Sequence, residues 1–273
     1  MSRLTRRNLL VGCAVLAAPQ ILPVFARSSV ADDRDASTAA YDTLLARYVV
    51  PGKDGVTRVR YAAWRANDAD LQDLNAFIGA QSNLSPSTFD AATAFAYWAN
   101  LYNALTLRVV LRAYPVSTIK SIKSTGTGFD LKALSGPWRT KLVEIEGVPM
   151  SLDDIEHGTM RPTFGDPRVH YAVNCASIGC PNLAGTAWRA ATLDADLDAA
   201  ARAYVNHPRG AAVSDGGSLE VSSLYKWYKE DFGSSDKGVI RHLQGFATEP
   251  LASALSGVSR IGGYDYDWSL NDA

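Results

Sequence analysis

The chain has 273 residues, with 27 lysines and arginines against 28 aspartates and glutamates, and three cysteines. This nearly neutral charge argues against a nucleic-acid-binding surface, and a chain of this length can bury a hydrophobic core without disulfide or metal support. We therefore expect a globular protein that takes a small-molecule or peptide-like ligand and binds no nucleic acid, in an oligomeric state that the sequence leaves open.

Residues 1–26 have the layout of a cleaved export signal. Arg6 and Arg7 precede an apolar run that closes on the small residue Ala26, and the run is too short for a membrane span. Paired arginines at this place are typical of twin-arginine export. We predict cleavage near Ala26, loss of Cys13 with the signal, and a periplasmic or secreted mature protein without a stable membrane span.

Residues 27–93 are predicted to form a helical N-terminal segment. Residues 27–36 are polar and are expected to be loosely ordered, whereas apolar residues at helical spacing begin near Thr38. The same spacing resumes over residues 58–81 and predicts one further helix there.

A third helix is predicted to begin at Ser85, with Pro86 at its first position, and to run as far as Tyr114. Apolar residues surround almost its whole axis, which indicates a central and buried helix. Asn100 and Asn103 lie one turn apart on one of these apolar faces. Because a buried amide needs hydrogen-bond partners, the two asparagines either tie down a neighbouring loop or orient a substrate.

Two local patterns follow this helix. Alternation over residues 141–150, with Gly147 at the turn, predicts a short β-hairpin. Ser151 and Asp154 have the spacing of a capping box at the start of a helix, and Gly158 is expected to end that helix.

The rest of the chain mixes strands with helices. The predicted elements are a strand over residues 168–174, a helix over 192–205, a hairpin over 210–223, a helix from 223, a helix over 240–246 and a final strand within 260–271. Helices cluster early and strands late without regular βαβ alternation, which favours an α+β fold with N-terminal helices packed on a small mixed or antiparallel sheet. Such a fold is loosely analogous to papain- or transglutaminase-type proteins, and the analogy transfers no activity.

Five sequence blocks resemble the bacterial and plant family of domain of unknown function 547. In chain order they read YWANLYNALTL, SLDDIEHGTMR, DPRVHYAVNCASIGCP, SSLYKWYKEDFG and YDWSLN. The resemblance implies a family core over residues 94–273, in one domain with the preceding helices, and it brings no known substrate. It also implies motif positions for Trp98, Asn103, Glu156, His157, His170, Asn174, Cys175, Cys180 and Pro181.

Cys175 is a candidate nucleophile. A cysteine attacks as the thiolate and needs a base, a cation or a helix N-terminus to lower its pKa. His157 and His170 are the candidate bases, and Glu156 completes the candidate catalytic set. Strand alternation would point His170 and Cys175 to opposite faces, whereas His157 meets no such objection.

The expected activity is that of a thiol-dependent hydrolase or acyl transferase acting on an amide or peptide-like substrate. Asn100, Asn103 and Asn174 are candidates to orient that substrate or to donate to an oxyanion. Arg161 is a candidate to bind a substrate carboxylate, with pairing to a nearby aspartate as the alternative.

Two alternatives use the same side chains. Cys175 and Cys180 are close enough in sequence for a disulfide, which predicts either a non-enzymatic exported binding protein or a redox-active loop. His157, His170 and the two cysteines are four donors of the kind that zinc takes, but their spacing contains no C-x₂-C hairpin. We therefore expect no metal and no other cofactor, with zinc as the minor alternative.

Two further regions are expected to be structural. His242 lies in an ordinary helix and is predicted at the surface. The aromatic block over residues 223–233 is predicted to pack, with Lys226 and Asp231 as candidates to close a polar network.

Overall fold

The computed structural model describes residues 29–123 and 136–273, and side chains from residue 37 onward. The predicted export signal and its cleavage point therefore lie outside the described residues. Helix α1 begins at Ser29, so the backbone of residues 29–36 is helical and not loosely ordered as the polar composition predicts. None of the helices in the described ranges is long and apolar enough to cross a membrane.

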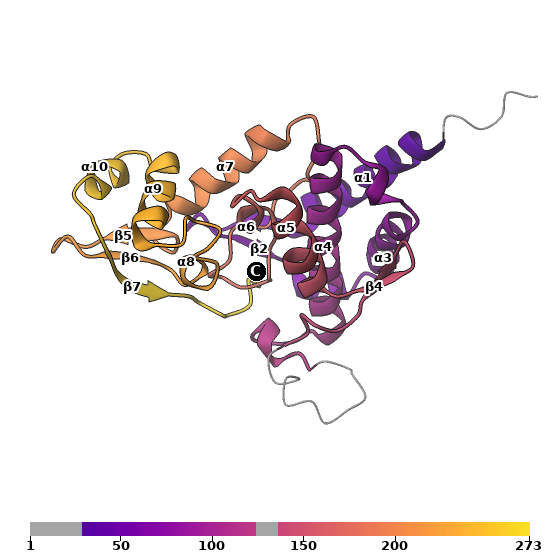
Figure 1. Cartoon of the computed structure of the whole chain (residues 1–273). Coiled ribbons are helices and arrows are strands. Elements are labelled where there is room, and N and C mark those ends of the chain that lie inside the picture. Colours follow the sequence, from indigo (N-terminus) through magenta and orange to yellow (C-terminus); the bar gives the residue numbers. More distant parts are fainter. Residues whose placement is uncertain (1–28, 124–135) are drawn as a thin grey trace, which may run out of the picture.

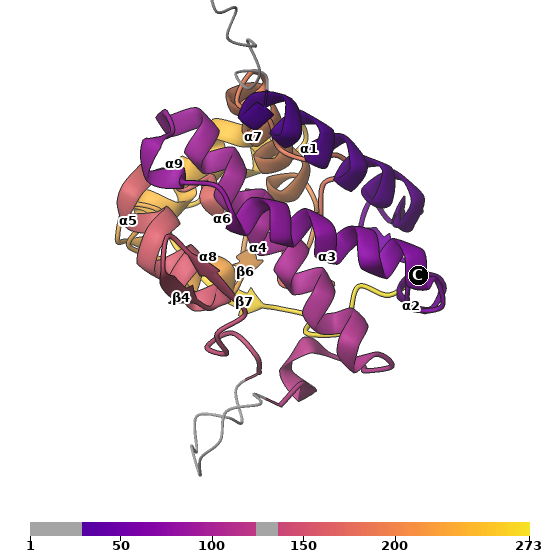
Figure 2. The same ribbon diagram turned by 90° about the vertical axis from the view of Figure 1, so that its right-hand side faces the viewer.

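The N-terminal half is a group of helices packed around α4, with one small hairpin (Figures 1 and 2). Its elements are α1 (Ser29–Tyr48), β1 (Val49–Pro51), β2 (Thr57–Val59), α2 (Tyr61–Arg65), α3 (Asp68–Ser82), η1 (Pro86–Thr88) and α4 (Ala91–Ala113). The hairpin corrects the expectation of a purely helical segment. The single helix predicted over residues 58–81 is also wrong, because Asn67 caps α3 by accepting from the backbone N–H of Asp70 and so starts a new helix.

Helix α4 begins five residues later than the sequence predicts. Ser85 and Pro86 open a separate 3-10 turn, and Asp90 caps α4 by accepting from the backbone N–H of Thr93 at 2.9 Å. The expectation of a central helix is confirmed, because α4 is buried from Phe95 to Leu111 with Arg108 as the one interruption.

The segment after α4 carries the local structures that position the acid and base groups. Its elements are η2 (Ile119–Ser121), β3 (Val143–Ile145), β4 (Val148–Met150), the π-helix η4 (Asp154–Met160) and α5 (Arg161–Phe164). The predicted hairpin and the predicted capping box are both present, since Ser151 and Asp154 each accept from the other's backbone N–H. The prediction that Gly158 ends the helix is wrong, because the chain stays helical as far as Phe164. The helix ends at Gly165, whose φ is +58°.

The strand predicted over residues 168–174 is a short helix, α6 (Val169–Ala172). The Asp166 side chain accepts from the backbone N–H of Arg168 at 2.8 Å and starts the turn. Asn103 on α4 then binds the Ala172 carbonyl at 2.9 Å and the Asn174 backbone N–H at 2.8 Å, which fixes the exit of the helix. The alternation argument that set His170 and Cys175 on opposite faces therefore does not apply.

The C-terminal half is a three-stranded sheet covered by helices (Figure 1). Its elements are α7 (Leu193–Val205), β5 (Ala211–Val213), β6 (Leu219–Ser222), α8 (Leu224–Trp227), α9 (Asp236–Phe246), α10 (Leu251–Leu255) and β7 (Ile261–Asp265). Strand β6 pairs antiparallel with β5 and parallel with β7. The fold is thus α+β with a small mixed sheet, as predicted.

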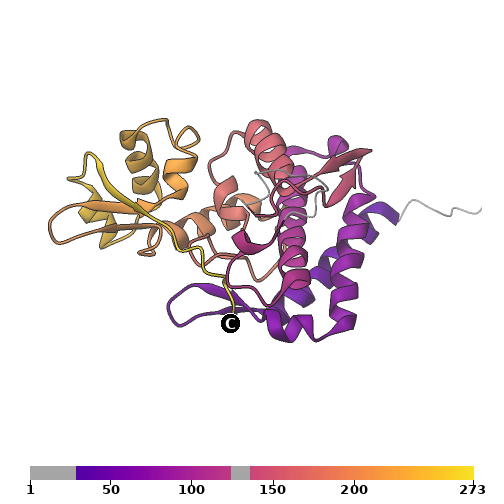
Figure 3. The ribbon, with the colours of Figure 1, turned by 90° about the horizontal axis from the view of Figure 1, so that it is seen from below.

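The chain after β7 returns to the helical half and joins the two parts (Figures 1 and 3). The backbone N–H of Leu270 donates to the Ser117 carbonyl at 2.8 Å, and that of Asn271 donates to the Ala176 carbonyl at 3.1 Å. The Asn271 carbonyl in turn accepts from Val59 at 2.8 Å. This tail therefore fastens the cysteine-containing loop to the N-terminal hairpin.

Candidate functional site

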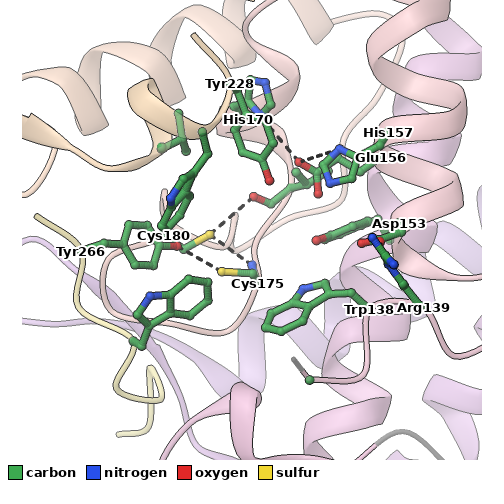
Figure 4. A pocket seen from close by; sticks show the side chains of 16 residues that line it. Trp138, Arg139, Asp153, Glu156, His157, His170, Cys175, Cys180, Tyr228 and Tyr266 are labelled. Carbon is green, nitrogen blue, oxygen red and sulfur yellow. Dashed lines mark hydrogen bonds and ion pairs between the residues drawn. The ribbon is translucent and has the colours of Figure 1, made fainter. Parts of the chain in front are cut away.

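A cavity of about 290 Å³ lies at the junction of the two halves. Figure 4 shows that the side chains lining it come from segments far apart in the sequence. One side carries Glu156, His157 and His170, and another carries Cys175 and Cys180. The four residues of the predicted catalytic set therefore line a single cavity.

The loop that presents Cys175 is shaped by its own neighbours. The Asn174 side chain accepts from the Ala176 backbone N–H at 2.8 Å and donates to the Pro181 carbonyl at 2.7 Å, so one amide closes the loop from both sides. At Gly179 a β-carbon would lie 2.8 Å from the Asp267 backbone nitrogen, so only glycine lets the tail pass this close.

The Cys175 sulfur lies among hydrogen-bonding groups that favour its anionic form. It is 3.1 Å from the Ser177 hydroxyl and 3.1 Å from the Tyr266 hydroxyl. A hydrogen bond from Cys180, together with these hydroxyls, outweighs burial and lowers the pKa of Cys175 to about 7. Burial raises the pKa of Cys180, whose sulfur accepts from the Cys175 backbone N–H at 3.1 Å. Both cysteines carry free thiols in this structure.

Glu156 lies between the two imidazoles. Its carboxylate is 3.6 Å from Nδ1 of His170 and 3.9 Å from Nδ1 of His157. Burial raises the pKa of Glu156, but hydrogen bonds from His170 and Tyr102 and the electrostatic effect of the imidazoles outweigh it and leave that pKa below its ordinary value. The carboxylate is therefore ionised inside the protein.

His170 is held on both ring nitrogens. Its Nε2 is 2.6 Å from Asp231, its ring stacks on Tyr228 at 4.3 Å, and only 1% of its side chain is exposed. Burial lowers the pKa of His170, but its contacts with Asp231 and Glu156 outweigh burial and raise that pKa above the ordinary histidine value. The two carboxylates therefore favour the protonated form of His170.

Arg161 extends this network away from the cavity. Its Nε donates to Asp231 at 2.6 Å, and its Nη2 donates to Glu230 at 2.5 Å. Burial raises the pKa of Asp231, but hydrogen bonds from His170 and Arg161 lower it well below its usual range. Arg161 does not line the cavity, so its placement gives no support to a role in binding substrate. Asp231 thus belongs to a polar network, as predicted, but its partners are Arg161 and His170 and not Lys226, whose ammonium lies over the Tyr264 ring.

The three asparagines proposed as substrate groups serve the backbone instead. Asn100 accepts from the Trp188 backbone N–H at 2.8 Å and donates to the Trp188 carbonyl at 2.9 Å. Asn103 and Asn174 make the loop contacts described above, and none of the three lines the cavity. The alternative in which these amides tie down neighbouring loops accounts for every hydrogen bond they make here.

Sequence reasoning missed the tyrosines and tryptophans of the cavity. The aromatic lining residues are Tyr102, Trp138, Trp227, Tyr228, Tyr266 and Trp268. A signal was available, because four of the six lie in the blocks SSLYKWYKEDFG and YDWSLN, which resemble family motifs. The first block was interpreted as packing, and the second as part of a final strand. His242 is not at the surface as predicted: its Nε2 is 2.7 Å from the Tyr171 hydroxyl, and Phe232 and Phe246 pack on its ring.

The described residues contain no group of three or more His, Cys, Asp or Glu side chains arranged to hold a metal. Both nitrogens of His170 already face carboxylates, and the Cys175 sulfur faces two hydroxyl groups. The zinc alternative therefore finds no support in the placement of its four proposed ligands.

Comparison with known proteins identifies a family and no activity. Residues 86–205 match the family described as "Protein of unknown function, DUF547". The matched range starts before α4 and ends with α7, and it contains Glu156, both cavity histidines and both cysteines. No curated protein and no solved structure matches the chain. Residues 86–205 of this chain therefore belong to the DUF547 family.

Proposed function

We propose that this protein is a thiol-dependent hydrolase or acyl transferase that acts on an amide or peptide-like substrate, with Cys175 as the nucleophile. The observation that carries the proposal is the half-buried Cys175 thiol, with its pKa lowered to about 7, on the wall of a cavity that also holds two histidines. A thiol of this pKa is about half ionised at neutral pH and still a good nucleophile.

We assign the proton transfers to His157. Nδ1 and Nε2 of His170 both face carboxylates, which leaves that ring no free lone pair, whereas His157 is 32% exposed at its side chain and lines the cavity. Within the described part of the chain Nδ1 of His157 has no hydrogen-bond partner. No hydrogen bond joins either described imidazole to the Cys175 sulfur (Figure 4), so the substrate would lie between His157 and Cys175.

The steps balance without a cofactor. The Cys175 proton passes to His157, the sulfur bonds to the substrate carbonyl carbon, and the carbonyl π electrons move to oxygen. When the C–N bond breaks, His157 returns the proton to the departing amine and a thioester remains on Cys175. A water then attacks the thioester carbonyl carbon while His157 takes its proton. The C–S bond breaks, His157 returns that proton to the Cys175 sulfur, and the free acid leaves; an amine in place of water gives transfer.

Tyr228 is our candidate donor to the carbonyl oxygen. Burial raises the pKa of Tyr228, so its hydroxyl stays protonated and able to donate, and Tyr228 lines the cavity. The Arg161 guanidinium lies 4.9 Å from the centre of its ring and the His170 ring stacks on it. Positive charge next to the ring would favour negative charge developing beside Tyr228.

Export belongs to this proposal. The arginine pair and the apolar run of residues 1–26 support twin-arginine export with cleavage near Ala26, and a periplasmic or secreted mature protein. The mass of the protein recovered outside the cytoplasm would test it, since retention of residues 1–26 would contradict cleavage.

A second candidate is a non-enzymatic exported binding protein whose Cys175–Cys180 pair forms a structural disulfide. It is favoured by the distance of 3.1 Å between the Cys180 sulfur and the Cys175 backbone nitrogen. In that case the oxidised form would be the working form, and neither thiol would react in the exported protein.

The first experiment is pH-dependent alkylation of the exported protein with iodoacetamide, followed by mass spectrometry. The proposal expects a single rapid modification at Cys175 with a midpoint near pH 7, while the buried Cys180 reacts slowly. Cys175→Ala removes this modification. Cys180→Ala retains it, with the midpoint moved to higher pH because the hydrogen bond from Cys180 is lost. A midpoint near pH 8.5, as for a free cysteine, or a protein unreactive until reduced, would contradict it.

Activity is tested with acyl thioesters and with peptide amides as donors. Cys175→Ala is expected to abolish release of the leaving group, and Cys175→Ser to leave only a small fraction of it, because an alcohol is far less ionised than this thiol. Unchanged turnover in Cys175→Ala would overturn the nucleophile assignment.

A further inference from the structure

Four aromatic side chains form one wall of the cavity, and the proposed chemistry does not use them. They come from three segments: Trp138 before β3, Trp227 at the end of α8, and Tyr266 and Trp268 in the tail after β7. All four are partly exposed, and Trp227 is 42% exposed. Large aromatic rings kept in contact with solvent inside a concave site are the usual lining of a ligand pocket.

The four rings pack on one another around Trp268 and do not make a flat platform. The centre of the Trp268 ring lies 4.7 Å from that of Tyr266, 5.4 Å from that of Trp227 and 5.9 Å from that of Trp138, at interplanar angles of 51°, 34° and 74°. Tilted rings of this kind present an uneven apolar surface to the cavity, which suits a compact apolar group, whereas a single flat face would suit a sugar ring lying across it.

This group of rings begins beside the candidate nucleophile. The Tyr266 hydroxyl is 3.1 Å from the Cys175 sulfur, and the Tyr266 ring is 4.8 Å from that of Trp227. A substrate whose carbonyl carbon reaches Cys175 would therefore direct the group attached to that carbon along the rings.

Charges around the four rings disfavour a cation beside them. The Lys120 ammonium lies 4.8 Å from the centre of the Trp268 ring and already occupies one face. Asp153, which also lines the cavity, is paired with Arg139 at 3.0 Å. A positively charged ligand would meet Lys120 at the rings, and Asp153 is already paired with Arg139, so an uncharged apolar group fits best.

We propose that the side chains Trp138, Trp227, Tyr266 and Trp268, named here the aromatic box, bind a bulky uncharged acyl group of the substrate, either aryl or alkyl. This inference rests on the proposed function, because it takes Cys175 as the atom that receives the acyl group. It narrows the substrate class to amides or thioesters of hydrophobic acids.

The direct test is binding to the Cys175→Ala protein, which cannot turn over a substrate. Ligand-observed NMR titration would compare phenylacetamide with acetamide. We expect phenylacetamide to bind at least tenfold more tightly, and Trp227→Ala in the same background to remove most of that difference. Trp227→Phe should recover part of it, and Val148→Ala, a change at a 57% exposed side chain on β4 outside the cavity, should leave it intact.

Two outcomes of that titration would overturn the aromatic box as an acyl site. One is equal affinity for phenylacetamide and acetamide. The other is preferential binding of N-acetylglucosamine or of phenyltrimethylammonium, which would identify a sugar or a cation as the ligand. Either result leaves the alkylation test of Cys175 untouched, so failure of this inference is distinguishable from failure of the proposed function.

A second readout uses the wild-type protein. With straight-chain acyl thioesters from acetyl to octanoyl, kcat/KM should rise about fourfold for each methylene that enters the aromatic box and then level off. Trp227→Ala should flatten the series, whereas Val148→Ala, outside the cavity, should leave its slope unchanged. A wild-type series that is flat from the start would contradict the proposed acyl site.

Discussion

His157 and His170 face the same carboxylate, that of Glu156, but the fold surrounds them in opposite ways. His170 has a carboxylate at each ring nitrogen and is 1% exposed at its side chain, whereas His157 is 32% exposed and has an unpartnered Nδ1 among the described residues. A ring engaged on both sides serves as a fixed charge, whereas a partly exposed ring that lines the cavity is available for proton transfer. The number of partners, and not proximity to Glu156, separates the two roles.

The largest expected effect is on turnover. His157→Gln should lower kcat of the thioester reaction about 10²- to 10⁴-fold, the usual contribution of a general base, with an unchanged circular dichroism spectrum. The measurement is steady-state kinetics beside His207→Gln, which removes a histidine away from the cavity. If His157→Gln kept full activity while a folded His170→Gln lost it, the two assigned roles would be exchanged and His170 would be the base.

The second largest expected effect is the loss of stability on replacing His170. His170→Gln leaves the buried Glu156 without its nearest cation and should cost about 3–5 kcal/mol of unfolding free energy in urea. Because the folded-state pKa of His170 is raised, its contribution is fully present below the unfolded value of about 6.5 and is lost as the pH rises through the folded value. The difference in unfolding free energy between wild type and His170→Gln should therefore decrease as the pH rises above 6.5. A difference that increased would contradict a raised folded-state pKa for His170.

Elements fixed by neighbouring residues could be predicted from the sequence. The β3–β4 hairpin follows from alternation around a turn at Glu146 and Gly147, both with positive φ. The capping box follows from Ser151 and Asp154, three positions apart. Cys175 could likewise be grouped with the histidines, because these residue types are scarce in the chain.

Features set by distant residues could not be predicted. Helix α6 was predicted as a strand, because its end is fixed by a hydrogen bond from Asn103 to Ala172, 69 residues away in the sequence. The aromatic box depends on a tail that returns after β7 to bring Trp268 beside Trp138. His242 read as a surface residue because its partner Tyr171 lies 71 positions earlier. In each case the local pattern was compatible with two structures, and a long-range contact selected one.

The smallest expected effect extends the comparison to His242, whose ring centre lies 4.7 Å from that of Phe232, while that of His170 lies 5.4 Å from it. Among the described residues no carboxylate is hydrogen-bonded to the His242 ring. Burial lowers its pKa to about 4, against a smaller opposing effect of the Asp166 charge. The unfolded chain therefore takes up a proton as the pH falls from about 6.5 to about 4, while the folded protein does not.

This difference costs stability at acidic pH. A shift of this size corresponds to at most about 3 kcal/mol, lost as the pH falls through that window. His242→Gln keeps a side-chain acceptor for the Tyr171 hydroxyl but cannot titrate, so its unfolding free energy should fall less than that of wild type between pH 6.5 and pH 4. Urea titrations at several pH values measure both curves. For each variant, the difference in unfolding free energy from wild type is plotted against pH. Slopes of opposite sign for His170→Gln and His242→Gln would show that carboxylate partners, and not burial, decide which histidine is charged. Slopes of the same sign would contradict that distinction.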